Sequence, residues 1–394
     1  MITIWIAFIV SLSGILILSR RSLPLALISG ALFLGFATLP FNQSVNLIFK
    51  TIIDPSTLFL VLAMGIIPLV GGVMKKGGQI DKLVNNIRVS QRYLLPISTA
   101  LMGFLPMPGG ALLSAPILEK GGAGVDNHLK AAINNWFRHL IIFVYPLSSA
   151  LIVSAEIARL DVYRAILYLL PALLIAFILG YVFFLRKVPK QYMYHDSFSP
   201  IGLLVPLLII LAAPAIDFTL KKAAGFGNSA TLIAVSISLG LSIILSERRV
   251  HLGGIIKSMK PWNFALIIFG MFLYMNVFQE SGISELIKSI PLPPLILSIT
   301  AGFVLGIATG RVHLPASIIL PVYLASVNDI TPIAFVLIYV AIFFGYVTSP
   351  VHPCLVVTCQ YFNVSIRAML RKLAAPTIVI LAIVYTLSLI ISVT

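Results

Sequence analysis

Four short stretches place polar side chains, prolines and glycines inside apolar surroundings, where a helix would otherwise continue. They are LPMPGGALLSAP from residue 105, YPLSSA from 145, ATGRVHLPAS from 308 and TSPVHP from 348. Free N–H groups at helix starts favour anions, and unwound carbonyls and hydroxyl groups can hold a cation. These stretches therefore predict a binding site for a small ion or molecule. The candidate binding residues are Pro108, Gly109, Gly110, Ser114, Tyr145, Ser148, Ser149, Thr309, Gly310, Arg311, His313, Ser317, Thr348, Ser349 and His352.

Arg311 indicates the sign of the ligand. A buried guanidinium is costly unless something anionic or strongly dipolar meets it, so anion binding and carbonyl capping are both open for Arg311. The acidic residues, with Asp54, Asp217 and Asp329 among them, are expected in loops or at span ends, which argues against a carboxylate-type cation/proton antiporter.

The other basic residues expected within the membrane have open roles. His313 and His352 can carry coupling protons or serve as hydrogen-bonded packing residues. Arg138 and His139 lie near the cytoplasmic end of their predicted span, where a structural role is as good an interpretation as a functional one.

The composition is that of a polytopic α-helical membrane protein. The chain has 394 residues, of which 59% are hydrophobic and 10% charged. Apolar runs predict about ten transmembrane helices, since about 20 residues cross the hydrocarbon layer as a helix. They lie near 1–18, 22–40, 57–74, 134–155, 165–185, 200–216, 229–246, 262–279, 330–348 and 374–392.

The net charge of +15 follows from membrane orientation and predicts no nucleic-acid partner. With the N-terminus outside, nineteen Lys and Arg residues fall in inner segments and six in outer ones; Arg138 and Arg311 fall within membrane segments. This is the positive-inside bias. We therefore expect a multi-pass protein of the cell (inner) membrane, with the lipid bilayer as partner and both termini external.

The second half of the chain repeats the first. YPLSSALIVS (145–154) aligns with SPVHPCLVVT (349–358), GGALLSAPI (109–117) with LPASIILPV (314–322), and QIDKLVNNI (79–87) with GISELIKSI (282–290), at nearly constant offset. Five spans in each half, an odd number, predict inverted repeats, the architecture of many secondary transporters. The first repeat covers residues 1–185, a cytoplasmic linker covers 186–199, and the second repeat covers 200–394.

Each repeat is expected to contain a re-entrant hairpin and a broken helix. Residues 93–118 are too few for two crossings and both ends should be inside, so this segment should dip into the membrane with PMPGG at its tip. Residues 291–323 should dip from the outside. Irregular backbone at this depth is tolerated only inside protein or along a cavity. YPLSSA and TSPVHP are interpreted as breaks in helices.

The motifs LPMPGGALLSAP and INNWFRH (133–139) resemble the domain-of-unknown-function 401 family of integral membrane proteins. Paired hairpins in an inverted five-span repeat also look like the ion-transporter superfamily, which includes gluconate, citrate and dicarboxylate permeases. This resemblance implies an elevator-type transporter whose hairpins and broken helices move against a scaffold, and it leaves a homodimer open. The Ser-Asn-Thr tips of the dicarboxylate branch are replaced here, at the second tip by Arg311-Val312-His313.

The predicted function is secondary active transport, a symport of a small carboxylate-like anion with Na⁺ or H⁺. A transporter or channel for an inorganic oxyanion or a cation, and an intramembrane enzyme, are the alternatives. No His-Glu-x-x-His motif and no phosphate-binding loop occurs in the sequence, so no enzymatic activity is expected. Cys354 and Cys359 are interpreted as small apolar fillers without a metal. Bound Na⁺ is the single candidate cofactor.

Overall fold

The computed structural model describes residues 2–104, 111–191, 198–288 and 293–393, and over these ranges the chain is helical with no strand. Long runs of Leu, Ile, Val and Ala exclude water, and a helix satisfies its backbone groups internally. Several helices begin at a side-chain cap. Asp54 accepts from the Thr57 amide at 2.8 Å, and Asp161 accepts from Arg164 at 2.9 Å.

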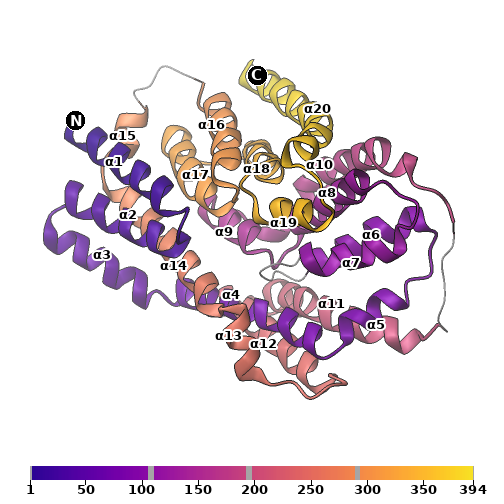
Figure 1. The fold of residues 1–394 in the computed structure, drawn as a ribbon. Helices are drawn as coiled ribbons and strands as arrows, with labels where there is room; N and C mark the ends of the chain where they lie inside the picture. Colours follow the sequence, from indigo (N-terminus) through magenta and orange to yellow (C-terminus); the bar gives the residue numbers. More distant parts are fainter. Residues whose placement is uncertain (1, 105–110, 192–197, 289–292, 394) are drawn as a thin grey trace.

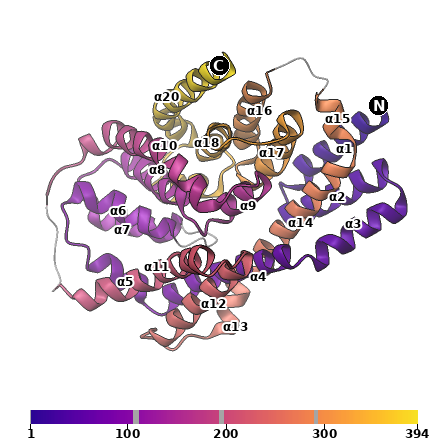
Figure 2. The ribbon, with the colours of Figure 1, turned by 180° about the vertical axis from the view of Figure 1, so that it is seen from behind.

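Two sets of helices divide the molecule. We call the first set the frame helices; in Figures 1 and 2 they form two arms that meet where α4 packs on α14. They are α1 (Ile2–Leu18), α2 (Leu23–Thr38), α3 (Phe41–Ile53), α4 (Pro55–Lys76), α5 (Gln79–Asn85), α11 (Pro200–Ala223), α12 (Asn228–Ile244), α13 (Leu252–Met259), α14 (Pro261–Glu280) and α15 (Ile283–Lys288).

The second set, the core helices, lies between the two arms of the frame (Figure 1). They are α6 (Gln91–Gly103), α7 (Ala111–Gly121), α8 (Asn127–Val144), α9 (Ser149–Ile157), α10 (Val162–Phe183), α16 (Pro294–Thr309), α17 (His313–Val327), α18 (Pro332–Val347), α19 (Pro353–Tyr361) and α20 (Ile366–Val393); a short 3-10 turn, η1 (Leu185–Lys187), follows α10. α18 is buried along nearly its whole length and forms the centre of this set.

The helix lengths support a protein embedded in a membrane. Within the described ranges, five helices are long and apolar enough to cross one: α4, α10 extended through η1, α11, α14 and α20. α8 and α9 pass the same test as a pair bent by 43°. The other four predicted spans are present as the helices α1, α2, α12 and α18, which have 16 or 17 residues each.

Each segment predicted as a re-entrant hairpin contains a packed pair of helices. α6 packs on α7 across 93–118, and α16 packs on α17 across 291–323; three of the four helices extend a few residues beyond these bounds. The tip residues 105–110 lie outside the described residues. Four short helices had no counterpart in the predicted spans: α3, α5, α13 and α15. α3 and α13 carry their apolar residues on one face, a pattern that a search for long apolar runs overlooks.

The crossing of α16 and α18 is very close. A Cβ on Gly345 would lie 2.4 Å from the carbonyl oxygen of Phe303, and a Cβ on Gly306 would lie 2.5 Å from the carbonyl oxygen of Ile342. Both contacts are with backbone, which has no rotamer by which to move away. The two helices can therefore approach this closely only through glycine.

We predict that Gly345→Ala lowers the thermal stability of the purified protein in detergent, because α16 and α18 must separate to admit the methyl group. Overpacking of this kind costs about 1–3 kcal/mol. Gly240→Ala in α12 is the matched control: its added Cβ meets nothing within 4 Å, so it should be neutral or stabilising. An unchanged unfolding temperature for Gly345→Ala would contradict this packing.

Candidate functional site

Two core helices are interrupted at the predicted positions. α8 ends at Val144 and α9 begins at Ser149, while α18 ends at Val347 and α19 begins at Pro353. Tight turns span the second gap: the Ser349 amide donates to the Tyr346 carbonyl and the His352 amide donates to the Ser349 carbonyl, each at 3.2 Å. The predicted breaks at YPLSSA and TSPVHP are confirmed as breaks in helical structure.

The tip of the α16–α17 hairpin lies directly against the second break. Gly310 has a φ of 59°, and a Cβ there would lie 2.9 Å from the His352 amide nitrogen and 3.0 Å from the Val351 carbonyl carbon. Ser349 Oγ donates to the Ile307 carbonyl at 2.6 Å. The conformation and the close approach both require glycine, so Gly310 seats the hairpin on the break.

The same tip also contacts the first break. His313, the first residue of α17, has its Nε2 2.9 Å from the hydroxyl of Ser149, the first residue of α9. α17 packs along α9, and α7 packs along α19 in the same way. Each hairpin is therefore paired with the second half of one broken helix.

One face of α8 supplies side-chain donors to the backbone at three interruptions. Arg138 Nη1 donates to the carbonyl of Met102 near the end of α6 at 2.8 Å. The Asn134 amide donates to the carbonyl of Ala111, at the start of α7, at 3.2 Å. The Asn135 amide donates to the carbonyl of Val347, at the end of α18, at 3.1 Å. These carbonyls lie where a helix begins or ends, and α8 provides their partners.

Asn134 is the centre of a buried polar network. Its Oδ1 accepts from the Ser114 hydroxyl at 2.5 Å, and its amide also donates to Thr358 Oγ1 at 3.0 Å. Ser114, Asn134 and Thr358 are all fully buried. The network joins α7, α8 and α19, so the polar interior extends from the breaks to the first hairpin.

Two cationic side chains flank a cluster of rings in this interior. Arg138 is 2% exposed and Arg311 is partly buried. Arg311 directly follows Gly310, the residue that packs against the His352 backbone. The His139 and His352 ring centroids are 4.7 Å apart, and those of Tyr346 and His352 are 4.1 Å apart. No salt bridge of Arg138 or Arg311 with a carboxylate occurs among the residues that the structure describes.

The remaining predicted site residues make mostly local contacts. Thr309, Thr348 and Ser317 bond to carbonyls within their own helices, at 2.7–2.8 Å. Tyr145 packs edge-on against Phe104, and Ser148 precedes α9 without a side-chain cap; they lie at the first break. The predicted residues Pro108, Gly109 and Gly110 lie outside the described residues.

Sequence reasoning missed several members of the site. The missed members are Asn134, Asn135, Tyr346, Cys354 and Thr358. Asn134, Asn135, Arg138 and His139 are spaced at i, i+1, i+4 and i+5, which puts them on one face of a helix, and this pattern within an apolar span was the available signal. Tyr346 precedes the second break, Cys354 and Thr358 follow it, and only the fold brings these residues to α8.

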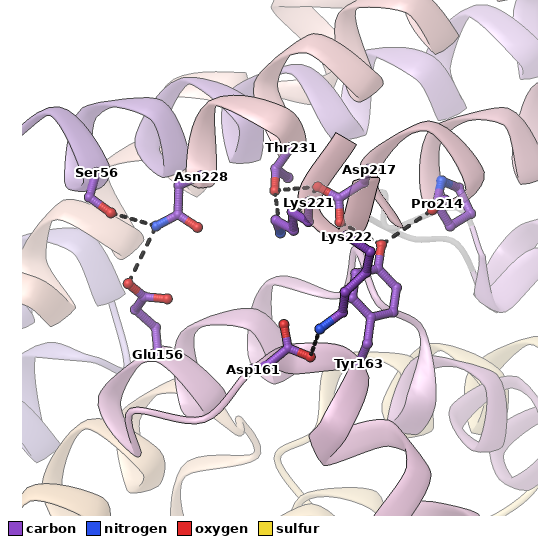
Figure 3. A network of polar contacts seen from close by, with 10 residues as sticks. All are labelled: Ser56, Glu156, Asp161, Tyr163, Pro214, Asp217, Lys221, Lys222, Asn228 and Thr231. Carbon is purple, nitrogen blue, oxygen red and sulfur yellow. Dashed lines mark hydrogen bonds and ion pairs between the residues drawn. The ribbon is translucent and has the colours of Figure 1, made fainter. Parts of the chain in front are cut away.

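The predicted position of Asp217 at a loop or span end requires a correction. Asp217 lies inside α11 and is fully buried. Its carboxylate accepts from Tyr163 at 2.5 Å and from Thr231 at 2.7 Å, and it lies 3.1 Å from Lys221 Nζ (Figure 3). This compensation by Lys221 and two hydroxyls makes burial of the carboxylate tolerable.

The Asp217 group belongs to a second polar network, which joins core to frame. Asp161 of the α9–α10 turn pairs with Lys222 of α11 at 3.1 Å, and Glu156 of α9 accepts from Asn228 of α12 at 3.3 Å (Figure 3). Asn228 also donates to Ser56 of α4 at 2.6 Å. A cavity of about 220 Å³ lies between these elements, lined among others by Glu156, Asp161, Lys221 and Asn228.

The structure is a bundle of apolar helices in which interrupted helices and a hairpin tip surround a buried polar interior. This arrangement places the chain in the class of helical membrane proteins. Within that class, the chain matches the family described as "Protein of unknown function (DUF401)" over residues 4–391, and it belongs to this family. The predicted family resemblance is thereby confirmed. Comparison with curated proteins gives no match.

We predict that Asn134→Ala destabilises the protein by about 1–3 kcal/mol, since the Ser114 hydroxyl and the Ala111 carbonyl lose a buried partner. The measurement is thermal unfolding in detergent. Asn42→Ala, on the exposed surface of α3, is the control and should leave stability unchanged. Equal unfolding temperatures for both variants would show that water replaces the amide and that this interior is hydrated.

Proposed function

We propose that this protein is a secondary transporter of a small organic anion, carboxylate-like in chemistry, coupled to Na⁺ or H⁺. One observation carries the proposal: Arg138, in α8, and Arg311, in the hairpin tip that packs on the second break, are buried or partly buried and have no carboxylate partner among the described residues. An uncompensated guanidinium in a low-dielectric interior is strongly unfavourable. An anionic substrate meeting both groups offsets that cost.

The bonds of Arg138 support this assignment. Its Nη1 is used by the Met102 carbonyl, whereas its Nε has no partner among the described residues and is buried. A carbonyl satisfies one donor but does not neutralise the charge. The guanidinium therefore keeps both a free donor and a net positive charge for a ligand.

The order of the helices supports two repeats. α5 begins at Gln79 and α15 at Ile283, α9 at Ser149 and α19 at Pro353, and α10 at Val162 and α20 at Ile366, each pair about 204 residues apart. The packing of the helices also repeats. Within each half, α6 packs on α8 as α16 packs on α18. Between the halves, α4 packs on α12 as α14 packs on α2, and α9 packs on α17 as α19 packs on α7. Inverted repeats of this kind place a substrate site where the halves meet.

The polar contacts at the helix ends support the predicted sidedness. Lys82 pairs with Glu247, and Arg92 Nε donates to the Val188 carbonyl at 2.8 Å, so segments predicted to be cytoplasmic meet each other. Asp161 meets Lys222, and both are predicted to be external. We therefore assign the network of Figure 3 to the external side.

Within this proposal the core helices form the moving unit and the frame helices form the scaffold of an elevator-type transporter. Helices α9 and α10 of the core contact α11 and α12 of the frame through the side chains of Figure 3, and two of these pairs are partly solvent-exposed. Exposed pairs of this kind contribute about 0–1 kcal/mol each, so they can break during a transport cycle.

The direct test is uptake into proteoliposomes of radiolabelled citrate, succinate, gluconate, sulfate and phosphate, with Na⁺ and pH gradients imposed separately. Uptake of an organic anion that depends on one gradient is the expected result. Uptake of sulfate or phosphate alone would move the assignment to inorganic oxyanions. Absence of uptake of every anion, with uptake of a cation, would overturn the proposal.

We predict that Arg311→Gln weakens binding of the transported anion by roughly 10- to 100-fold, because a hydrogen bond to a charged group contributes about 1.5–3 kcal/mol. Arg311→Lys should restore part of the loss, since an ammonium supplies charge without the planar fork. Anion-dependent thermal stabilisation of the purified variants measures the effect.

The same assay includes a control and a contrary outcome. Arg164→Gln, at the exposed start of α10, should bind as wild type does. Arg138→Gln should lose both anion stabilisation and basal stability, since it also holds the Met102 carbonyl. Equal stabilisation of wild type and Arg311→Gln would remove Arg311 from the site.

The movement of core against frame gives a further prediction. In Glu156→Cys with Asn228→Cys, a short bifunctional thiol reagent should join α9 to α12 and abolish uptake, because the core can then no longer move. Ser56→Cys with Asn228→Cys, which joins α4 to α12 within the frame, should leave uptake near that of the unreacted protein. Full uptake after cross-linking of the first pair would exclude this motion.

A further inference from the structure

Three side chains of metal-ligand type converge beside the proposed anion site. They are His139 in the middle of α8, His352 in the break before α19, and Cys354 at the start of α19. One ligand atom from each lies within 4.8 Å of the other two. Both histidines are 1% exposed. The expectation that Cys354 is an apolar filler does not describe these surroundings, whereas it still fits the buried Cys359.

The hydrogen bond that His139 makes through Nδ1 leaves Nε2 as the ring nitrogen that can bind a metal ion. Its Nδ1 meets the backbone carbonyl of Asn135, which can only accept, so the proton is placed on Nδ1. Nε2 is thereby left with its lone pair, 3.1 Å from the Tyr346 hydroxyl. Histidines that bind metals characteristically donate the second ring N–H to a carbonyl or carboxylate in this way.

The buried ring of His352 is the strongest indication of a ligand at this cluster. Neither of its ring nitrogens has a hydrogen-bond partner among the described residues, although the side chain is buried. The nearby Val347 carbonyl accepts from the Asn135 amide at 3.1 Å, and it makes no hydrogen bond of good geometry with the His352 ring. A buried polar atom without a partner is costly and uncommon, and a ligand supplies the missing interaction.

Cys354 supplies the sulfur ligand of the cluster, and Arg138 is its neighbour. Cysteine binds metals as the thiolate, so binding of a metal ion releases the thiol proton.

We propose that His139, His352 and Cys354 bind a soft transition-metal ion through two imidazole nitrogens and one thiolate. This donor set selects ions such as Zn²⁺ over Na⁺, Mg²⁺ and Ca²⁺, which prefer oxygen ligands. Zinc bonds of about 2.0–2.3 Å place tetrahedral ligands roughly 3.3–3.8 Å apart, so small side-chain rotations close the site. Three protein ligands leave a fourth position of a tetrahedral ion, where an anion offsets the excess charge.

The test uses the full-length protein purified without a histidine tag and titrated with Co²⁺ as a spectroscopic substitute for Zn²⁺. We expect one ion per chain, with a thiolate-to-cobalt charge-transfer band in the near ultraviolet that Zn²⁺ abolishes by competition. Cys354→Ser should lose the band, and His352→Ala should weaken binding at least about 100-fold. Cys359→Ser is the matched control and should bind as wild type does.

A second measurement needs no change to a ligand. In the Cys359→Ser background, Zn²⁺ should slow alkylation of Cys354 by N-ethylmaleimide, EDTA should reverse the protection, and Mg²⁺ and Ca²⁺ should give none. A band that persists in Cys354→Ser, or alkylation unaffected by Zn²⁺, would overturn the proposal. Neither measurement uses transport, so the metal site stands or falls independently of the proposed function.

Discussion

The constraint on which the rest of this structure depends is that a helix interrupted inside an apolar bundle frees backbone groups that need partners. Water is scarce there, and each unsatisfied group costs several kcal/mol. The core meets the requirement in two ways. Local turns bond the Ser349 amide to Tyr346 and the His352 amide to Ser349 within the second break. Asn135 and Arg138 of α8 donate to carbonyls in the last turns of α18 and α6. The hairpin tip at Gly310 adds direct backbone packing. The interruptions are therefore held both by their own turns and by side chains from α8.

This solution places charge at the centre of the protein. The donor that holds the Met102 carbonyl is the charged Arg138 side chain. Arg311 adds a second positive charge in the hairpin tip that packs on the second break. The residue that bonds the end of α6 thus also adds to the positive potential of the interior. Substitutions of Arg138 consequently combine structural and ligand effects, whereas Arg311, whose side chain is only partly buried, separates them better.

Sequence reasoning recovered the features that local chemistry determines. Proline and glycine marked both breaks and the second hairpin tip, because these residues change the backbone wherever they occur. It placed the remaining site members less well, because their roles depend on partners far along the chain: Asn135 meets Val347, and Asn134 meets Thr358. The burial of Asp217 escaped for the same reason, since its compensation comes from Tyr163 and Thr231 on other helices. The sequence pattern located the breaks in the helices, and the fold showed which residues pack against those breaks.

The two kinds of contact in the molecule bear on how it moves. Inside the core, backbone meets backbone at Gly306, Gly310 and Gly345, where a single methyl group would clash. Such contacts resist sliding, so the breaks and the hairpin tip should travel together. Between core and frame, the network of Figure 3 is made by side chains, and the Asp161–Lys222 pair is exposed over 37% and 48% of its side chains. Tyr163 is the exception, because its hydroxyl reaches the buried Asp217 of the frame. If the core moves, breaking that one bond leaves a buried carboxylate with Lys221 and Thr231 as its remaining partners, and the frame supplies both.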